Sequence, residues 1–97
     1  MNVAFHPDAE VEFNEAIEWY EMREIGLGLD FATQVYAAVQ RAITFPYAWQ
    51  AMDSEIRRTL VHRFPYGVLY VAEPDRLLVV AVMHLLRQPE YWRNRKS

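Results

Sequence analysis

The sequence predicts an α+β fold, in which a helical hairpin covers one face of a mainly antiparallel sheet. An apolar period typical of helices runs through residues 7–44, and it gives way to extended, aliphatic and β-branched runs after residue 55. A short apolar segment, NVAF, precedes the helices and has the composition of a further strand. We therefore expect the order β-α-α-β-β-β, in one domain over residues 1–97, because a chain of 97 residues can bury a single core but hardly two.

The first helix is expected to run from Pro7 to Arg23. Proline suits the first turn of a helix, where its missing N–H costs nothing, and Asp8 and Glu10 complement the positive helix end. One apolar stripe at helical spacing should pack on the sheet, and it consists of Ala9, Phe13, Ala16, Ile17 and Tyr20. The rest of the surface, interpreted as the solvated side, carries Glu10, Glu12, Glu15, Glu18 and Glu21.

A second helix is expected over residues 29–44. The segment IGLG interrupts the helical pattern with two glycines before it, and Pro46 follows its end. Its apolar side comprises Phe31, Val35, Ala38, Val39, Ala42 and Ile43. Two helices joined by so short a turn should form an antiparallel hairpin.

Three extended segments follow, and they predict an antiparallel meander. Their sequences are RRTLVH, GVLYVAE and RLLVVAVM, separated by the turn signals FPYG and Pro74-Asp75. The last segment is apolar without alternation, which indicates cover on both faces or a central place in the sheet. We expect the helical hairpin to supply cover, and NVAF to join the same sheet.

The composition excludes several kinds of site. The chain has no cysteine, so neither a disulfide nor a thiolate site is possible. It also lacks H-E-x-x-H, P-loop and G-x-S-x-G motifs, so we expect no metal and no cofactor. The N-terminus has no signal-peptide pattern and no apolar run is long enough to span a bilayer, so we expect a soluble, cytoplasmic protein without a membrane partner.

The net charge of −3 conceals an asymmetry between the two halves of the chain. Residues 1–50 carry two cations and eight anions, whereas residues 51–97 carry eight cations and five anions. Clustered charges of one sign steer association with partners of the opposite sign. The second half is therefore the one suited to an anionic partner.

The stretch HLLRQPEYWRNR, residues 84–95, contains the side chains that are candidates for binding or catalysis. We expect a short terminal helix that begins at Gln88-Pro89 and carries Trp92. The end of the last strand and this helix could together aim four side chains toward one spot. These are His84, Arg87, Tyr91 and Arg95.

Such a set suits an anionic target, because arginine binds phosphate through paired, charge-assisted hydrogen bonds. RNA cleavage by attack of a 2′-hydroxyl would need a base, an acid and a cation at the phosphate, and His84, Tyr91 and Arg87 have these chemical types. Structural roles are the alternative: Tyr91 and Trp92 would close the core, and His84 would cap the strand end by hydrogen bonding.

Three further arginines lie around the first strand of the meander, namely Arg57, Arg58 and Arg63. They could extend the basic, target-binding surface that Arg87 and Arg95 begin. Arginines at the edge of a sheet also discourage pairing with other chains, which is the alternative interpretation.

Several stretches of the chain together resemble a known family. The terminal pattern is H-x-x-R-x-P-x-Y-W-x-x-R, preceded by RRTLVHRFPYGVLY, by the helix opening HPDAEVEFNEAIEWYE and by GLG before the second helix. Over essentially the whole chain this resembles the RelE/ParE superfamily of type II toxin–antitoxin toxins. The resemblance implies a cytoplasmic growth inhibitor that a cognate antitoxin neutralises in a hetero-oligomeric complex, with a role in plasmid retention or stress response.

The resemblance implies one of two activities. RelE-like members cut mRNA on the ribosome without a metal, which would give His84, Arg87 and Tyr91 catalytic roles, and ParE-like members inhibit DNA gyrase. RelE-like members tend to be strongly basic and to carry an arginine where this chain has Gly67, after Tyr66. The acidic total charge and the missing arginine favour the ParE-like activity, because phosphate neutralisation supplies most of the affinity for RNA. A non-toxic relic that only binds an antitoxin is the third possibility.

Overall fold

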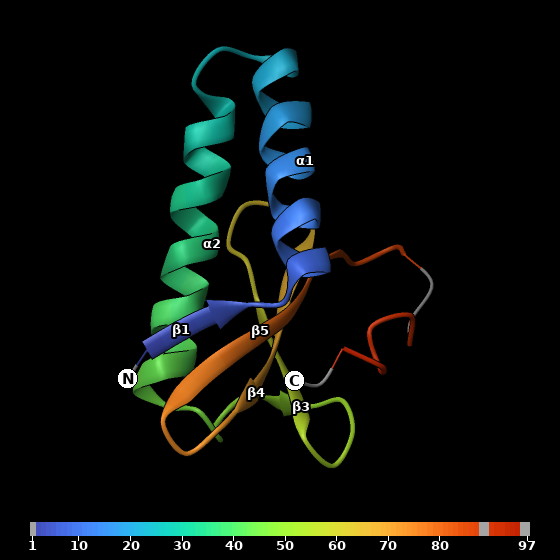
Figure 1. The fold of residues 1–97 in the computed structure, drawn as a ribbon. Helices are drawn as coiled ribbons and strands as arrows, with labels where there is room; N and C mark the ends of the chain where they lie inside the picture. Colours follow the sequence, from blue (N-terminus) through green and yellow to red (C-terminus); the bar gives the residue numbers. More distant parts are fainter. Residues whose placement is uncertain (1, 88–89, 96–97) are drawn as a thin grey trace.

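A computed structural model of the protein describes residues 2–87 and 90–95, which form two helices on one face of a five-stranded sheet (Figure 1). The expected α+β fold is confirmed, with one added two-residue strand. The elements in chain order are β1 (Asn2–Phe5), α1 (Pro7–Arg23), α2 (Leu27–Thr44), β2 (Gln50–Ala51), β3 (Ile56–Leu60), β4 (Tyr66–Ala72) and β5 (Arg76–His84).

The sheet has the strand order β1-β5-β4-β3-β2, so β5 lies in its interior. The first strand pairs with β5 in parallel, and the pairs β5–β4, β4–β3 and β3–β2 are antiparallel. Seven consecutive residues of β5, from Leu77 to Met83, are buried. Both causes that the sequence allowed for this unbroken apolar run are present: β5 lies between two strands, and both of its faces are covered.

The second helix begins at Leu27, two residues earlier than predicted, because Gly28 is a helical residue rather than a helix breaker. A Cβ atom at Gly28 would lie 2.7 Å from the carbonyl oxygen of Ile17, so the close approach of the two helices requires glycine here. The Glu21 carboxylate accepts hydrogen bonds from the N–H groups of Gly26 and Gly28, and thus caps α2 from α1.

The helices bury the larger of two hydrophobic clusters against the sheet. Phe13 of α1 and Phe31 of α2 meet at its centre, with ring centroids 6.2 Å apart. The phenol of Tyr70 donates a 2.7 Å hydrogen bond to the Pro46 carbonyl and so ties β4 to the loop after α2. Figure 1 shows the tip of the hairpin projecting beyond the sheet, and residues 21–26 at this tip are exposed.

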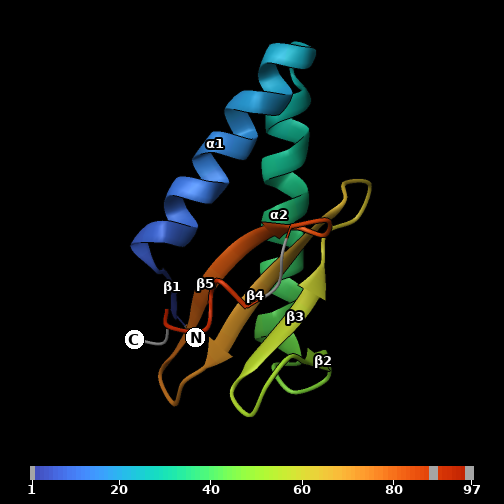
Figure 2. The ribbon, with the colours of Figure 1, turned by 90° about the vertical axis from the view of Figure 1, so that its right-hand side faces the viewer.

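The C-terminal segment covers the opposite face of the sheet, on the side away from α2 (Figure 2). Trp92, with 1% of its surface exposed, is buried there in the smaller cluster, together with Ile56, Leu69 and Val80. The sequence interpretation of Trp92 as a core residue is confirmed.

The predicted terminal helix is wrong for the residues that are described. Residues 90–94 form turns, in which the N–H of Arg93 bonds to Glu90 and the N–H of Arg95 bonds to Trp92. Glu90 has a φ of 83°, a left-handed conformation that no α-helix accommodates, and burial of the Trp92 indole draws the chain onto the sheet. The expected helix start, Gln88-Pro89, lies outside the described residues. Across residues 2–87 and 90–95, neither helix is long and apolar enough to cross a membrane.

Candidate functional site

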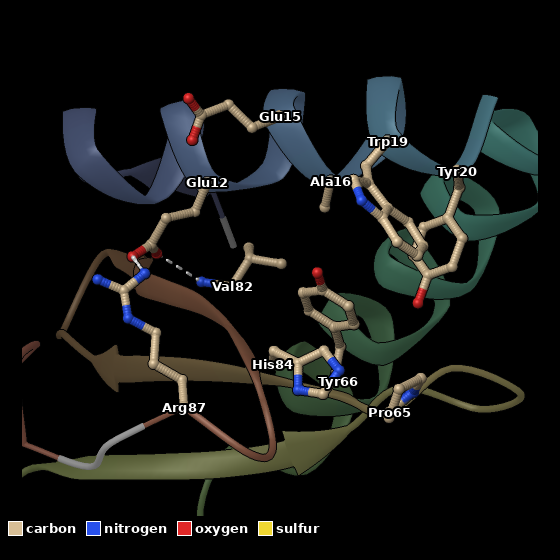
Figure 3. A pocket seen from close by; sticks show the side chains of 10 residues that line it. All are labelled: Glu12, Glu15, Ala16, Trp19, Tyr20, Pro65, Tyr66, Val82, His84 and Arg87. Carbon is tan, nitrogen blue, oxygen red and sulfur yellow. Dashed lines mark hydrogen bonds and ion pairs between the residues drawn. The ribbon is translucent and has the colours of Figure 1, made fainter. Parts of the chain in front are cut away.

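A cavity of about 570 Å³ lies between α1 and the adjoining ends of β4 and β5 (Figure 3). Its lining comes from three parts of the chain that are far apart in sequence. The residues are Glu12, Glu15, Ala16, Trp19 and Tyr20 of α1, Pro65, Tyr66, Val82, His84 and Arg87. We refer to this cavity as the α1 pocket.

The α1 pocket exists because β1 is shorter than β5. Pairing between the two strands ends at Val79, and the last N–H of this ladder, on His6, bonds to the Val79 carbonyl. Farther along the same edge, the N–H of Val82 bonds to Oε1 of Glu12 at 3.1 Å. A side chain of α1 thus takes the place of a strand partner and holds the helix beside the open edge of β5.

Aromatic rings form one wall and part of the floor of the α1 pocket. The indole of Trp19, which is 51% exposed, meets Tyr20 edge-on at 5.1 Å. Tyr66 contacts Tyr20 at 6.1 Å and the imidazole of His84 at 5.1 Å, and Figure 3 shows its hydroxyl pointing toward α1. Burial, and then the nearby Tyr20 and Glu12, raise the pKa of Tyr66, so its phenol stays neutral at physiological pH.

Glu12 is the centre of an ion-pair cluster at the other end of the α1 pocket. Its side chain is only 12% exposed, and Oε2 lies 2.9 Å from Nη1 of Arg95 and 3.9 Å from Nη1 of Arg87. Arg95, itself 14% exposed, also reaches the Val80 carbonyl at 3.2 Å. The interpretation of Glu12 as a solvated residue is wrong, because this carboxylate faces β5 and binds both the strand and the C-terminal segment.

Tyr91 lies between two of the predicted arginines. The guanidinium of Arg87 is 4.0 Å from its ring centroid and that of Arg95 is 4.9 Å away. Its hydroxyl is buried beside Glu12 without a hydrogen bond of ordinary geometry. Burial first, and then the Glu12 carboxylate, raise the pKa of Tyr91, so the phenol holds its proton firmly. Tyr91 does not line the α1 pocket, and a proton-transfer role for it stays a prediction.

His84 and Arg87 are the predicted residues that do line the α1 pocket. Nδ1 of His84 accepts a 3.1 Å hydrogen bond from the N–H of Leu86, which is the capping bond that the sequence left open as an alternative. The Arg87 side chain is 55% exposed, and Figure 3 shows it rising toward Glu12. Three of the four predicted C-terminal side chains therefore gather at Glu12, and the fourth, His84, packs on Tyr66 instead.

The arginines around β3 do not join this cluster in one basic surface. Arg57 donates to the Trp49 carbonyl at 2.8 Å and Arg58 donates to Gln50 Oε1 at 2.8 Å. These two neighbours lie on opposite faces of the sheet, because side chains alternate along a strand. Arg63 lies in the turn before β4, 3.8 Å from a carboxylate oxygen of Asp30. Their assignment to target binding stays a prediction.

Gly67, where RelE-like members are expected to carry an arginine, is buried under a neighbouring side chain. A Cβ atom at Gly67 would lie 3.0 Å from Cδ and 3.1 Å from Cγ of Arg58. A side chain at Gly67 would require the flexible stem of Arg58, which crosses this position from β3, to shift by a few tenths of an ångström.

Glu12, Trp19 and Tyr66 were not among the site residues expected from the sequence. One signal for Glu12 was present: it lies three residues after Ala9 and four before Ala16, at the border of the buried stripe of α1. Nothing in the sequence indicated that Trp19 and Tyr66 would meet across a cavity. Among the described residues, no three histidine, aspartate or glutamate side chains are placed to hold a metal ion.

Comparison with known proteins adds one finding. Neither a protein-family model nor a curated protein sequence matches this chain. Among solved structures, one chain of an assembly described as the chromosomal ParDE TA system from P. aeruginosa superimposes with a TM-score of 0.72 at 12% sequence identity. The match covers 88% of this chain and 96% of that one. The two chains share a fold, with helices packed on one face of a mixed sheet.

Proposed function

We propose that this chain is the toxin of a type II toxin–antitoxin pair and that its target is DNA gyrase. The observation that carries the proposal is the shared fold with a chain of a ParDE toxin–antitoxin system, over 88% of the length. The terminal pattern of residues 84–95 supports the same assignment independently, because it is a property of the amino-acid sequence and does not depend on the similarity in fold.

A neutralising partner is supported by the amount of apolar surface that the helical hairpin leaves uncovered. Large exposed side chains on the two helices and the turn between them are Val11, Trp19, Met22, Ile25, Leu29 and Tyr36. Exposed apolar side chains that gather on one element mark surfaces for other proteins, and a helical hairpin suits an added amphipathic helix. We propose that an antitoxin covers this surface and forms a hetero-oligomer with the toxin.

The choice of gyrase over ribosome-bound mRNA rests on charge and on the surroundings of the C-terminal residues. The net charge of −3 opposes binding to the RNA backbone, and two of the expected catalytic or phosphate-binding side chains face inward. Arg95 is paired with Glu12, and the Tyr91 hydroxyl is buried beside the same carboxylate. Arg87 is the exposed cation of this cluster, and we propose that it contacts the target.

One observation favours the RelE-like alternative, a metal-independent mRNA endoribonuclease. His84 and Arg87 line the same cavity, so a base and a phosphate-binding cation could face one substrate there. Cleavage would then need a proton donor other than the buried Tyr91 hydroxyl. Codon-specific cuts in a translating extract, with gyrase unaffected, would establish this alternative in place of the proposal.

The first experiment is induced expression of the chain with and without the product of the adjacent reading frame. We expect growth arrest when it is expressed alone, and recovery together with a co-purifying complex when both are present. The purified chain should inhibit DNA supercoiling by gyrase and leave ribosome-bound mRNA intact. Normal growth together with complex formation would show a non-toxic, antitoxin-binding relic, and a well-behaved monomer that ignores the adjacent product would refute the assignment.

A further inference from the structure

We propose that the α1 pocket receives a basic side chain, arginine or lysine, from the neutralising protein partner. This inference rests on the proposed function for the source of the side chain. The recognition itself rests on the chemistry of the pocket, which combines aromatic rings with an acidic rim.

The walls of the α1 pocket have the composition of a cation site. Three aromatic side chains line it, and aromatic faces attract guanidinium and ammonium groups through their electron-rich centres. The molecule contains an internal example: the guanidinium of Arg23 lies 4.0 Å from the ring centroid of Trp19. The same indole also borders the pocket. Because Arg23 already occupies one of its faces, an incoming cation would contact the other face or the rings of Tyr20 and Tyr66.

The charges around the pocket point the same way. Glu12, Glu15 and one cation, Arg87, line the pocket. Two further cations contact its lining, Arg95 at Glu12 and Arg23 at Trp19. Glu12 is committed to Arg95 and to the N–H of Val82. Glu15 is exposed at the rim, and within residues 2–87 and 90–95 it makes no hydrogen bond or ion pair. An incoming cation therefore finds one available carboxylate.

An anionic ligand such as a phosphate suits the same space poorly. Arg87 would be its main cation, and the Glu12 carboxylate, which lies 3.9 Å from the Arg87 guanidinium and is shared with Arg95, offsets part of its charge. Burial is the main cause of the raised pKa of Tyr66 and disfavours charge of either sign, whereas the smaller effects of Tyr20 and Glu12 disfavour negative charge in particular. The acidic character of α1, with five glutamates between residues 10 and 21, extends this field along the helix.

A titration with a minimal probe tests the recognition directly. The chain has three tryptophans, so three indole N–H signals can be followed by NMR. Acetyl-arginine methylamide should shift the Trp19 signal and leave two internal references unmoved. These are Trp49, whose indole donates to the Arg41 carbonyl, and the buried Trp92. The isosteric, uncharged acetyl-citrulline methylamide should shift none of them.

Two matched substitutions locate the carboxylate. Glu15→Gln should weaken binding of the arginine probe by roughly five- to tenfold. Glu18→Gln, on the same helix but outside the pocket lining, should leave the affinity for the probe unchanged. Trp19→Ala removes the reporting indole, so its effect is measured by isothermal titration calorimetry, where binding of the arginine probe should be lost. Its half-exposed position predicts a normal fold that a thermal melt can verify. Equal binding of arginine and citrulline probes, or binding of inorganic phosphate or a dinucleotide at Trp19, would overturn the proposal.

The full complex tests the source of the side chain. If the adjacent reading frame encodes a neutralising partner, Trp19→Ala and Glu15→Gln should each weaken its binding by about tenfold, and Glu18→Gln should not. Unchanged affinity of both pocket variants would overturn the inference while leaving the toxin–antitoxin assignment intact. If the wild-type chain neither arrests growth nor binds the adjacent product, the proposed source of the basic side chain is refuted. The preference of the pocket for arginine over citrulline would then be supported by the titration only.

Discussion

The two faces of β5 are equally buried, but they are covered in different ways. On one face the helical hairpin contributes many apolar side chains, among them Phe13, Phe31 and Val35. On the other face a short C-terminal segment without regular structure contributes mainly one indole, that of Trp92. Losing one apolar side chain should therefore destabilise the helical cover only modestly, whereas losing the indole of Trp92 should destabilise the C-terminal cover strongly.

The two covers also differ in what holds them in place. The hairpin is held by its own backbone hydrogen bonds and by Glu21, which caps one helix from the other. The C-terminal segment is held from outside, through the ion pair of Arg95 with Glu12 and through its bond to the Val80 carbonyl. The segment that carries the proposed target-contacting residues is thus attached by a few tertiary contacts, whereas the partner-binding hairpin is self-supporting.

The largest expected effect comes from Trp92→Ala. Removing a fully buried indole from the smaller cluster should lower the free energy of unfolding by about 3–5 kcal/mol and impair antitoxin binding with it. Urea denaturation followed by circular dichroism measures the change. Trp49→Ala, at a partly buried indole beside the larger cluster, is the matched control and should cost clearly less. A Trp92→Ala protein as stable as the control would show that the C-terminal cover does not depend on this indole.

Breaking the ion pair that attaches the C-terminal segment should give the next largest effect. Glu12→Ala and Arg95→Ala should each cost about 2–3 kcal/mol, because each removes the closest counter-charge of a mostly buried partner. Among the described residues, Glu12 then keeps only the exposed Arg87 as a counter-charge, at 3.9 Å, and Arg95 keeps only the exposed Asp8, at 3.7 Å. A double-mutant cycle measured by denaturation should show a smaller loss for the pair than the sum of the two single losses. Additivity within about 0.5 kcal/mol would mean that Glu12 does not hold the C-terminal segment through Arg95.

Arg87→Ala should separate function from stability at the same place. The side chain is more than half exposed, so its removal should change the free energy of unfolding by only about 0.5 kcal/mol. Growth arrest on induced expression should nevertheless be lost, because the proposed target contact is gone. Thermal melts and growth assays on the same variant check both parts. Full toxicity in a normally folded Arg87→Ala protein would exclude the C-terminal cluster as the functional site.

The smallest effect is expected from Tyr91→Phe. The substitution keeps the ring between the two guanidinium groups and removes a buried hydroxyl that makes no hydrogen bond of ordinary geometry, so stability should change by less than about 0.5 kcal/mol. Toxicity should be retained if Tyr91 serves packing. Loss of toxicity without loss of fold, measured by the same paired assays, would support a proton-transfer role and with it the nuclease alternative.

The helices and strands could be predicted from the sequence because their signals are local. The stripe that includes Phe13 on α1 and the proline at its first turn place that helix at the residues predicted, 7–23. The unbroken apolar run of residues 77–83 identified a strand in the interior of the sheet. Each of these patterns depends on neighbours within a few residues, so no knowledge of distant contacts was needed.

The site depended on contacts that no local pattern encodes. Glu12 reads as one more glutamate on an acidic helix until Arg95, at the far end of the chain, is brought beside it. By sequence alone Gly28 is interpreted as a helix breaker. Only the structure shows that the backbone of α1 occupies the space that a side chain at Gly28 would need. The C-terminal residues have a sequence compatible with a helix, but residues 90–94 form turns with Trp92 buried on the sheet, and isolated helices of this length are marginal in water. The pocket between Trp19 and Tyr66 likewise arises only where the shorter β1 stops pairing and α1 continues past it.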